Sequence, residues 1–75
     1  MELLFFGSLT DITQVEKMSM DTIIDTDSLK ELLIIKYPGF QKAKYFIAIN
    51  QQMVHQNTAL KQDDIVALMP PFSGG

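Results

Sequence analysis

The chain has 75 residues, enough for one domain, and 47% of them are hydrophobic, which is typical of a compact globular protein. Six lysines, no arginine and nine acidic residues give a formal net charge of −3, which argues against nucleic acid as a partner. The absence of cysteine excludes disulfides, thiolate metal sites and a cysteine nucleophile, and no apolar run reaches the ~20 residues of a membrane span, so we expect a soluble, cytoplasmic protein with no membrane partner.

Two strands and a short helical turn are expected at the start of the chain. Residues 2–7, ELLFFG, form an apolar run closed by glycine, which predicts a strand buried on both faces. Residues 10–16 are polar, with apolar residues spaced three apart, and predict one short helical turn. A second strand is expected around residues 18–24.

The main helix has the clearest local signal. Within residues 25–33, DTDSLKELL, Ser28 is expected to cap the first amides while Glu31 reaches back to it in a capping box. Residues 37–39, YPG, should end the helix after about ten residues, because proline cannot continue it. The apolar residues expected on its inner face are Leu29, Leu32 and Leu33.

The second half of the chain predicts a hairpin and a final strand. Residues 45–54 are β-branched and aromatic on either side of a turn-prone break at residues 50–52, NQQ, which predicts a β-hairpin. Residues 61–64, KQDD, form the next turn, in which Asp63 is expected to take a left-handed conformation. Residues 65–69, IVALM, are apolar at every position and predict the last strand.

The order of these elements predicts an α+β fold. Two strands, one main helix and two or three further strands fit a mixed sheet of four to five strands with the helix packed on one face. The first and last strands should be central and parallel, because both are apolar throughout. This is the β-grasp, or ubiquitin-like, arrangement, and we expect it to occupy residues 1–75 as a single domain.

One short helix can cover only one face of such a sheet. In the first strand Leu4 and Phe6 alternate with other apolar residues, and the last strand is apolar on both faces as well. The uncovered face would then expose contiguous apolar surface, which in a small protein usually marks a partner site. The alternative is that the loop over residues 9–15 folds across this face.

The chain ends in residues 70–75, PPFSGG, an extended tail. Pro70 and Pro71 end the last strand and stiffen the tail as it leaves the sheet. Gly74 and Gly75 lack side chains, so the terminal carboxylate could enter a channel too narrow for any Cβ. A carboxylate is a poor electrophile and must first be joined to an adenylate, after which sulfur, a thiol or an amine can take the acyl group.

The sequence resembles the MoaD/ThiS family of ubiquitin-like sulfur carriers, and in particular its molybdopterin synthase small subunits. The resemblance is carried by LLFFGSLTD, SLKELL, FIAINQQMV and LKQDDIVALMPPFSGG, which together span nearly the whole chain. The Pro-Pro-x-x-Gly-Gly terminus is its most specific element. Two departures are Asp63, where a glycine is usual, and Thr10, where many relatives have a basic residue.

This resemblance implies a carrier role in molybdenum cofactor biosynthesis. Gly75 would be adenylated with ATP by a ubiquitin-activating-type (MoeB-like) enzyme and converted to a thiocarboxylate. The tail would then enter the large (MoaE-like) subunit of molybdopterin synthase and donate sulfur to cyclic pyranopterin monophosphate. The chain itself would bind no cofactor and would be a non-catalytic subunit, with the catalytic residues on the large subunit.

The resemblance also assigns roles to individual residues. Gly75 would carry the sulfur, and Gly74 and Ser73 would insert into the partner's channel. The residues expected in the apolar interface are Phe6, Met53, Met69 and Phe72.

Other functions remain open from the residues alone. The carrier could serve thiamine synthesis or transfer RNA thiolation, the chain could be a ubiquitin-like protein modifier, or it could be a binding module with an inert tail. Catalysis by the chain itself is not expected, because Ser8 and Ser73 have no partnered base. No metal site is expected either, because His55 is the only histidine and the acids at positions 63 and 64 lack further ligands.

Overall fold

The computed structural model describes residues 1–71 and contains five strands, two α-helices and one 3-10 helix. In chain order these are β1 (Glu2–Phe5), α1 (Leu9–Thr13), β2 (Lys17–Ser19), α2 (Thr26–Lys36), the 3-10 helix η1 (Pro38–Gln41), β3 (Phe46–Ile49), β4 (Gln52–Val54) and β5 (Ile65–Met69). The predicted last strand agrees with β5 at both ends. The hairpin and the end of the main helix are also confirmed.

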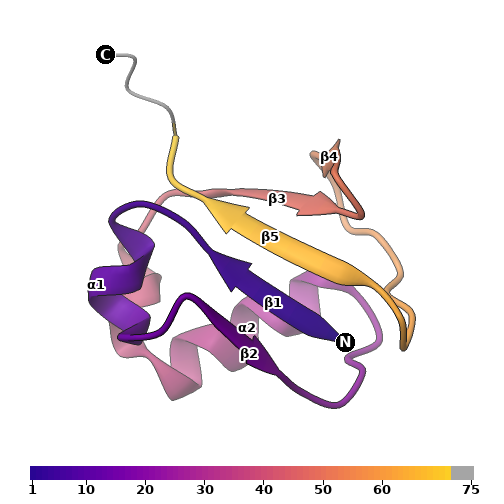
Figure 1. Ribbon diagram of the computed structural model, residues 1–75, viewed down its shortest axis with the longest axis horizontal. Coiled ribbons are helices and arrows are strands. Elements are labelled where there is room, and N and C mark those ends of the chain that lie inside the picture. Colours follow the sequence, from indigo (N-terminus) through magenta and orange to yellow (C-terminus); the bar gives the residue numbers. More distant parts are fainter. Residues whose placement is uncertain (72–75) are drawn as a thin grey trace.

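The strands form one mixed sheet in the order β2-β1-β5-β3-β4 (Figure 1). The parallel pair is β1 and β5, and the other neighbours are antiparallel. The first and last strands of the chain therefore lie inside the sheet, as their apolar sequences predict. The β-grasp fold is confirmed, with five strands.

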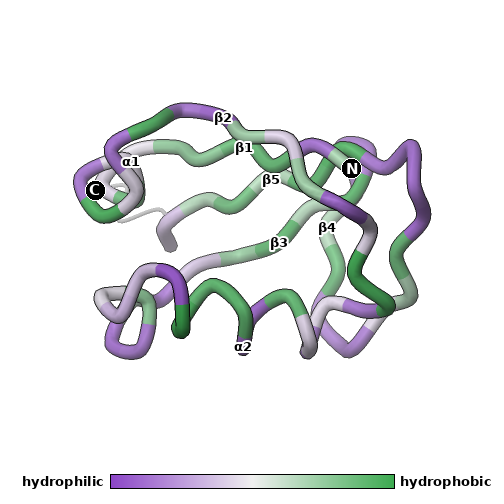
Figure 2. Tube along the Cα trace, turned by 90° about the horizontal axis from the view of Figure 1, so that it is seen from below, coloured by the Kyte–Doolittle hydropathy of each residue, from purple (hydrophilic) through white to green (hydrophobic). Residues whose placement is uncertain are grey.

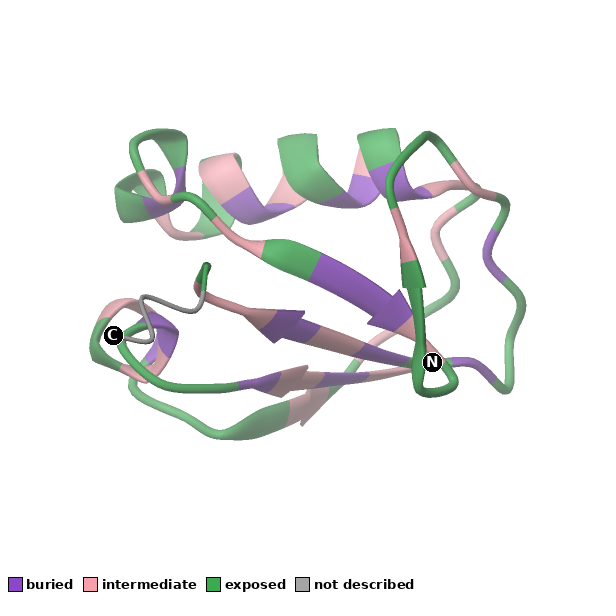
Figure 3. Cartoon of the chain, turned by 90° about the horizontal axis from the view of Figure 1, so that it is seen from above, coloured by how far each residue is buried: buried purple, intermediate pink, exposed green. Residues whose placement is uncertain are grey.

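The helix α2 packs across one face of the sheet and encloses the core (Figure 2). Its residues Leu29 and Leu33 are fully buried, whereas Leu32 is half-buried. Figure 3 shows the buried side of α2 turned toward the strands and its exposed side turned away from them. The core residues are Leu3, Phe5, Leu9, Leu29, Leu33, Phe40, Ile47, Leu60, Val66 and Leu68.

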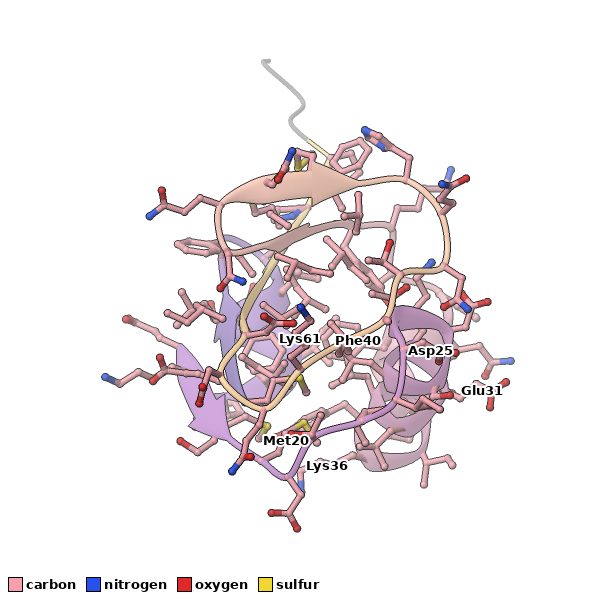
Figure 4. The ribbon with its side chains drawn as sticks, turned by 90° about the vertical axis from the view of Figure 1, so that its right-hand side faces the viewer. Met20, Asp25, Glu31, Lys36, Phe40 and Lys61 are labelled. Carbon is pink, nitrogen blue, oxygen red and sulfur yellow. The ribbon has the colours of Figure 1, made fainter. Side chains whose placement is uncertain are left out.

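The 3-10 helix η1 adds an aromatic cluster to one end of this core. The ring of Phe40 meets that of Tyr45 edge to face, with centroids 5.4 Å apart, and lies 6.2 Å from that of Phe5. Figure 4 shows Phe40 in the interior of the molecule. Edge-to-face and tilted contacts of this kind stabilise beyond the area that they bury. They fix the segment that leads from α2 into β3.

The predicted start of the main helix is wrong by three residues. The N-cap is Asp25, whose Oδ1 accepts a hydrogen bond from the Ser28 amide at 2.9 Å, so Ser28 lies inside α2. Glu31 is exposed and lies on the outer side of the helix (Figure 4). The side-chain amide of the distant Asn57 donates to Asp25 Oδ2 at 3.1 Å, which further holds Asp25 at the helix start.

The predicted first strand is also corrected. The strand β1 ends at Phe5, and only Leu3 and Phe5 on its helix side are buried, while Leu4 is half-buried and Phe6 is 47% exposed. Burial on both faces is therefore wrong, because within residues 1–71 the helices pack on one face of the sheet and leave the other open. The second strand is shorter than predicted and covers Lys17–Ser19.

The sequence predicted the hairpin turn correctly but not the conformation of the turn before β5. In the hairpin, Asn50 and Gln51 have φ of 51° and 71°, the pair of positive values that suits the twist of a two-residue hairpin turn. Asp63, in contrast, does not have a positive φ, so the predicted left-handed residue is wrong. That turn is closed instead by Asp64, whose carboxylate accepts a hydrogen bond from the Lys61 amide at 2.8 Å.

Candidate functional site

The face of the sheet opposite α2 carries a continuous apolar surface, here called the exposed apolar face. It forms a shallow groove of about 700 Å³ bordered by Asn50 and Gln51. The apolar residues that line it are Leu4, Phe6, Ala48, Met53, Ile65, Ala67 and Met69. Phe6, Met53 and Ile65 keep 47%, 43% and 44% of their surface in water.

The register of the strands explains why these residues meet. Ala67 of β5 lies opposite Leu4 of β1 on one side and Ala48 of β3 on the other, and Ala48 in turn lies opposite Met53. Because side chains alternate between the two faces of a strand, Met69 shares the face of Ala67. The Phe6 amide donates to the Leu68 carbonyl at 3.0 Å, which continues the pairing one residue beyond β1.

Three of the four residues predicted for a partner interface therefore lie together on this face: Phe6, Met53 and Met69. The fourth, Phe72, lies outside the described residues. Ile65 also lies on this face and was not among the predicted interface residues, although the alternation along the last strand puts it on the same side as Met69.

The loop over residues 9–15 does not cover this face, so the alternative arrangement is wrong. Leu9 and Thr13 of α1 are buried, and Ile12 lies against Gly39 of η1, on the helix side of the sheet. Val15 borders a separate shallow groove beside Phe6, at the edge of the sheet. The apolar face is therefore left open along β1, β5, β3 and β4.

The tail leaves the sheet directly from this site. Pro70 follows the last residue of β5 and lies against Gly7, where an added Cβ would be only 2.9 Å from the proline Cγ. Gly7 has a φ of 58°, a conformation that glycine adopts without strain. Pro70 and Pro71, for which a stiffening role was predicted, directly follow β5, whereas the predicted tail residues Ser73, Gly74 and Gly75 lie outside the described residues.

A polar network holds the hairpin turn that borders the apolar face. The side-chain amide of Asn50 donates through Nδ2 to Asp64 Oδ1 at 2.9 Å, and Asn50 Oδ1 accepts from the backbone amide of Ile65 at 3.0 Å. The backbone hydrogen bond from Lys61, and then the one from Asn50, hold the pKa of the Asp64 carboxyl below its usual value. Asp64 thus serves to fix two turns at the rim of the groove.

The residues that could suggest other chemistry lie apart from one another. His55 is exposed and its ring meets the edge of Phe46, with centroids 6.4 Å apart. Ser8 precedes α1, and its side chain makes no capping hydrogen bond. Within residues 1–71, no three side chains of histidine, aspartate or glutamate come close enough to hold a metal ion. No helix in the same range is long and apolar enough to cross a bilayer.

Comparison with known proteins places the chain in a family. The model of the ThiS family matches residues 3–75, and the chain therefore belongs to the ThiS family. Among curated proteins, it is similar to the molybdopterin synthase sulfur carrier subunit of Haemophilus influenzae, with 28% identity over 100% of this chain and 99% of that protein.

Among solved structures, the chain is similar to a protein of Pyrococcus furiosus described as a candidate molybdopterin converting factor, subunit 1. The TM-score is 0.85 at 18% identity, covering 93% of this chain and 94% of that one. This match concerns the fold alone. It agrees with the ubiquitin-like topology predicted from the order of the elements.

Proposed function

We propose that the chain is the sulfur carrier and small subunit of a molybdopterin synthase. The observation that carries this proposal is that Pro70 and Pro71, the start of the tail, follow β5 directly beside the exposed apolar face. A partner that encloses the tail would also meet this face. Membership of the ThiS family and the similarity to a molybdopterin synthase sulfur carrier subunit support the same function.

The chemistry begins with activation of Gly75. A carboxylate oxygen attacks the α-phosphorus of ATP on a MoeB-like activating enzyme, and pyrophosphate leaves. A sulfur nucleophile then attacks the carbonyl carbon of the acyl-adenylate and displaces AMP, which leaves a thiocarboxylate. ATP is thus a substrate of the activating enzyme, and the carrier supplies only its terminus.

The second stage takes place on a MoaE-like large subunit. The tail enters that subunit and passes its sulfur to cyclic pyranopterin monophosphate, while water restores the carboxylate of Gly75. The small residues of the tail, Ser73 and Gly74, suit a narrow channel because they add little or no side-chain bulk. Catalytic side chains are assigned to the large subunit.

The exposed apolar face would provide the docking surface for both enzymes. Phe6, Met53 and Met69, together with Phe72 of the tail, would be buried against each partner in turn. Methionine is flexible and polarizable, so it can repack against two different surfaces. This property suits a carrier that must leave one enzyme and bind the next.

Mass spectrometry of the intact chain tests the first stage. The purified chain is incubated with ATP, a sulfide source and the cognate activating enzyme, and then alkylated briefly at neutral pH. Replacement of oxygen by sulfur changes the mass almost as much as oxidation of one of the five methionines, so alkylation is needed to tell them apart. The chain has no cysteine, so rapid alkylation localised to Gly75 identifies a thiocarboxylate.

Deletion of Gly75 provides the matched control. The truncated chain should unfold at the same temperature as the full chain, yet give no alkylated product and no molybdopterin. Molybdopterin formation by the truncated chain would refute the proposed role of Gly75. If Gly75 is adenylated but is then joined through isopeptide bonds to lysines of other proteins, the chain is a protein modifier instead.

A carrier for thiamine synthesis or transfer RNA thiolation is the second candidate. Membership of the ThiS family supports it equally, because such a carrier would use the same adenylate and thiocarboxylate steps and differ only in the sulfur acceptor. Complementation of strains that lack each pathway's own carrier separates these functions. Growth restored only in the thiamine or transfer RNA strain would overturn the assignment to molybdopterin.

A further inference from the structure

The charged residues of this chain are divided unevenly along the sequence. Residues 32–62 contain four lysines and no acidic residue, a formal charge of +4. The remaining residues contain two lysines and all nine acids, a formal charge of −7. The net charge of −3 therefore hides a strongly basic segment within an acidic protein.

The fold brings two of these lysines to the base of the tail. The antiparallel pairing of β3 with β5 sets Phe46 opposite Met69, so the segment before β3 and the prolines after β5 lie at the same end of the sheet. Lys42 and Lys44 are both exposed, and together with the two prolines they line a groove of about 630 Å³, here called the tail-base groove. Its other lining residues are Ser8, Leu9, Ile12, Gly39 and Ala43, none of them acidic.

Several acids lie at the opposite end of the sheet. Glu2 begins β1, and its amide donates to the carbonyl of Asp64, which immediately precedes β5. Because β1 and β5 are parallel, this end is farthest from the point where the tail leaves (Figure 1). Asp11 of α1 and Glu16, whose carbonyl accepts from the Phe5 amide, lie at the same end as the tail, but neither of them lines the tail-base groove. Among the residues that the structure describes, the only charged side chains that line this groove are Lys42 and Lys44, so its lining is positive.

We propose that the tail-base groove receives an acidic segment of the enzyme that adenylates Gly75. This inference rests on the proposed function, because it assumes that Gly75 is adenylated. An enzyme that encloses the tail must pass over Pro70 and Pro71, and so over Lys42 and Lys44. Apolar contact is not directional, so the exposed apolar face alone does not fix how the carrier is oriented on the enzyme. Complementary charges do fix that orientation, and they also speed association. The acidic remainder of the chain would repel the same segment elsewhere.

The test is the steady-state rate of adenylation, followed by release of pyrophosphate at varied carrier and salt concentrations. The double variant Lys42→Glu/Lys44→Glu should raise KM for the carrier about tenfold with kcat nearly unchanged, because exposed charges act mainly on association. The dependence of kcat/KM on salt should also become weaker than in the unmodified chain. The matched control is Lys30→Glu/Lys36→Glu, which reverses two exposed charges on α2.

The control separates a local effect from one of net charge. Both double variants carry the same formal charge, and thermal unfolding checks that both remain folded. An equal rise in KM for the two variants, or no rise for either, would overturn the inference while leaving the proposed function intact. An unmodified chain that is not adenylated at all would instead refute the proposed function, and the inference with it.

Discussion

Replacing Phe6 by lysine tests whether the exposed apolar face is a docking surface. In the isolated chain Phe6 keeps 47% of its surface in water, so the lysine stem can lie along the strand with its ammonium group in solvent. We therefore expect the variant to fold with a loss of about 1 kcal/mol in the free energy of unfolding. For a chain of this size, such a loss lowers the thermal midpoint by roughly 4–8 °C.

Binding to the large subunit should change far more. A phenylalanine side chain buries roughly 200 Å², so on the order of 100 Å² of Phe6 remains for a partner to cover. At about 25 cal/mol per Å² its loss costs about 2.5 kcal/mol, or roughly 70-fold in Kd. The lysine ammonium, buried without a partner, weakens binding further.

The assay is isothermal titration calorimetry of each variant against the purified large subunit, with thermal unfolding of the isolated chains alongside. Ile35→Lys is the matched control, because Ile35 is 77% exposed on α2 and should tolerate the same charge without loss of binding. Phe5→Lys is the buried counterpart, at 2% exposure, and should unfold the chain. If Phe6→Lys unfolds the chain, Phe6 is misplaced; if it folds and binds with unchanged Kd, the apolar face is not the docking surface.

Three further predictions concern the fold. Asp25→Ala should lower the thermal midpoint by several degrees, and Ser28→Ala by less, since Asp25 is the helix cap; the reverse order would favour the cap predicted from sequence. Asp64→Asn should destabilise the chain most above about pH 4. Folding lowers the pKa of Asp64, so its carboxylate stabilises the fold fully above the pKa of the unfolded chain, and this stabilisation is lost as the pH falls through the pKa of the folded chain. The measurement is the free energy of unfolding from denaturant titrations across pH. If the difference in this free energy between Asp64→Asn and the unmodified chain does not shrink in acid, the reasoning is contradicted. Leu33→Ala should cost about 3 kcal/mol in the same titrations, whereas Ile35→Ala should cost under about 0.5 kcal/mol, since only Leu33 is buried.

The sequence predicted those features that neighbouring residues decide. The last strand was predicted over residues 65–69 and the hairpin turn near Asn50, because apolar alternation and turn-forming residues act over a few positions. The end of α2 before Pro38 has an equally local cause, the missing proline amide. The same alternation, counted against a single helix, indicated that one face of the sheet would remain uncovered.

The candidate site could be predicted only in part. Phe6, Met53 and Met69 were expected in one interface, and the structure does bring them onto one face. Ile65 was not among the residues predicted for the interface, although the alternation along the last strand places it on the face of Ala67 and Met69. The four last residues of the tail lie outside the described part of the chain, so their roles stay predictions.

The tertiary structure decided what depends on segments far apart in the chain. The cap predicted from sequence was Ser28, but the structure uses Asp25, which is also held by a hydrogen bond from the side-chain amide of Asn57, about thirty residues away. The turn before β5 is held by the Asp64 carboxylate bonded to Asn50, which made a left-handed Asp63 unnecessary. By itself the sequence determined the elements and their apolar faces, because period and turn chemistry are local. Only the tertiary structure decided which residue caps α2 and which closes the turn before β5, because hydrogen bonds and charge clusters between distant segments form only once the chain has packed.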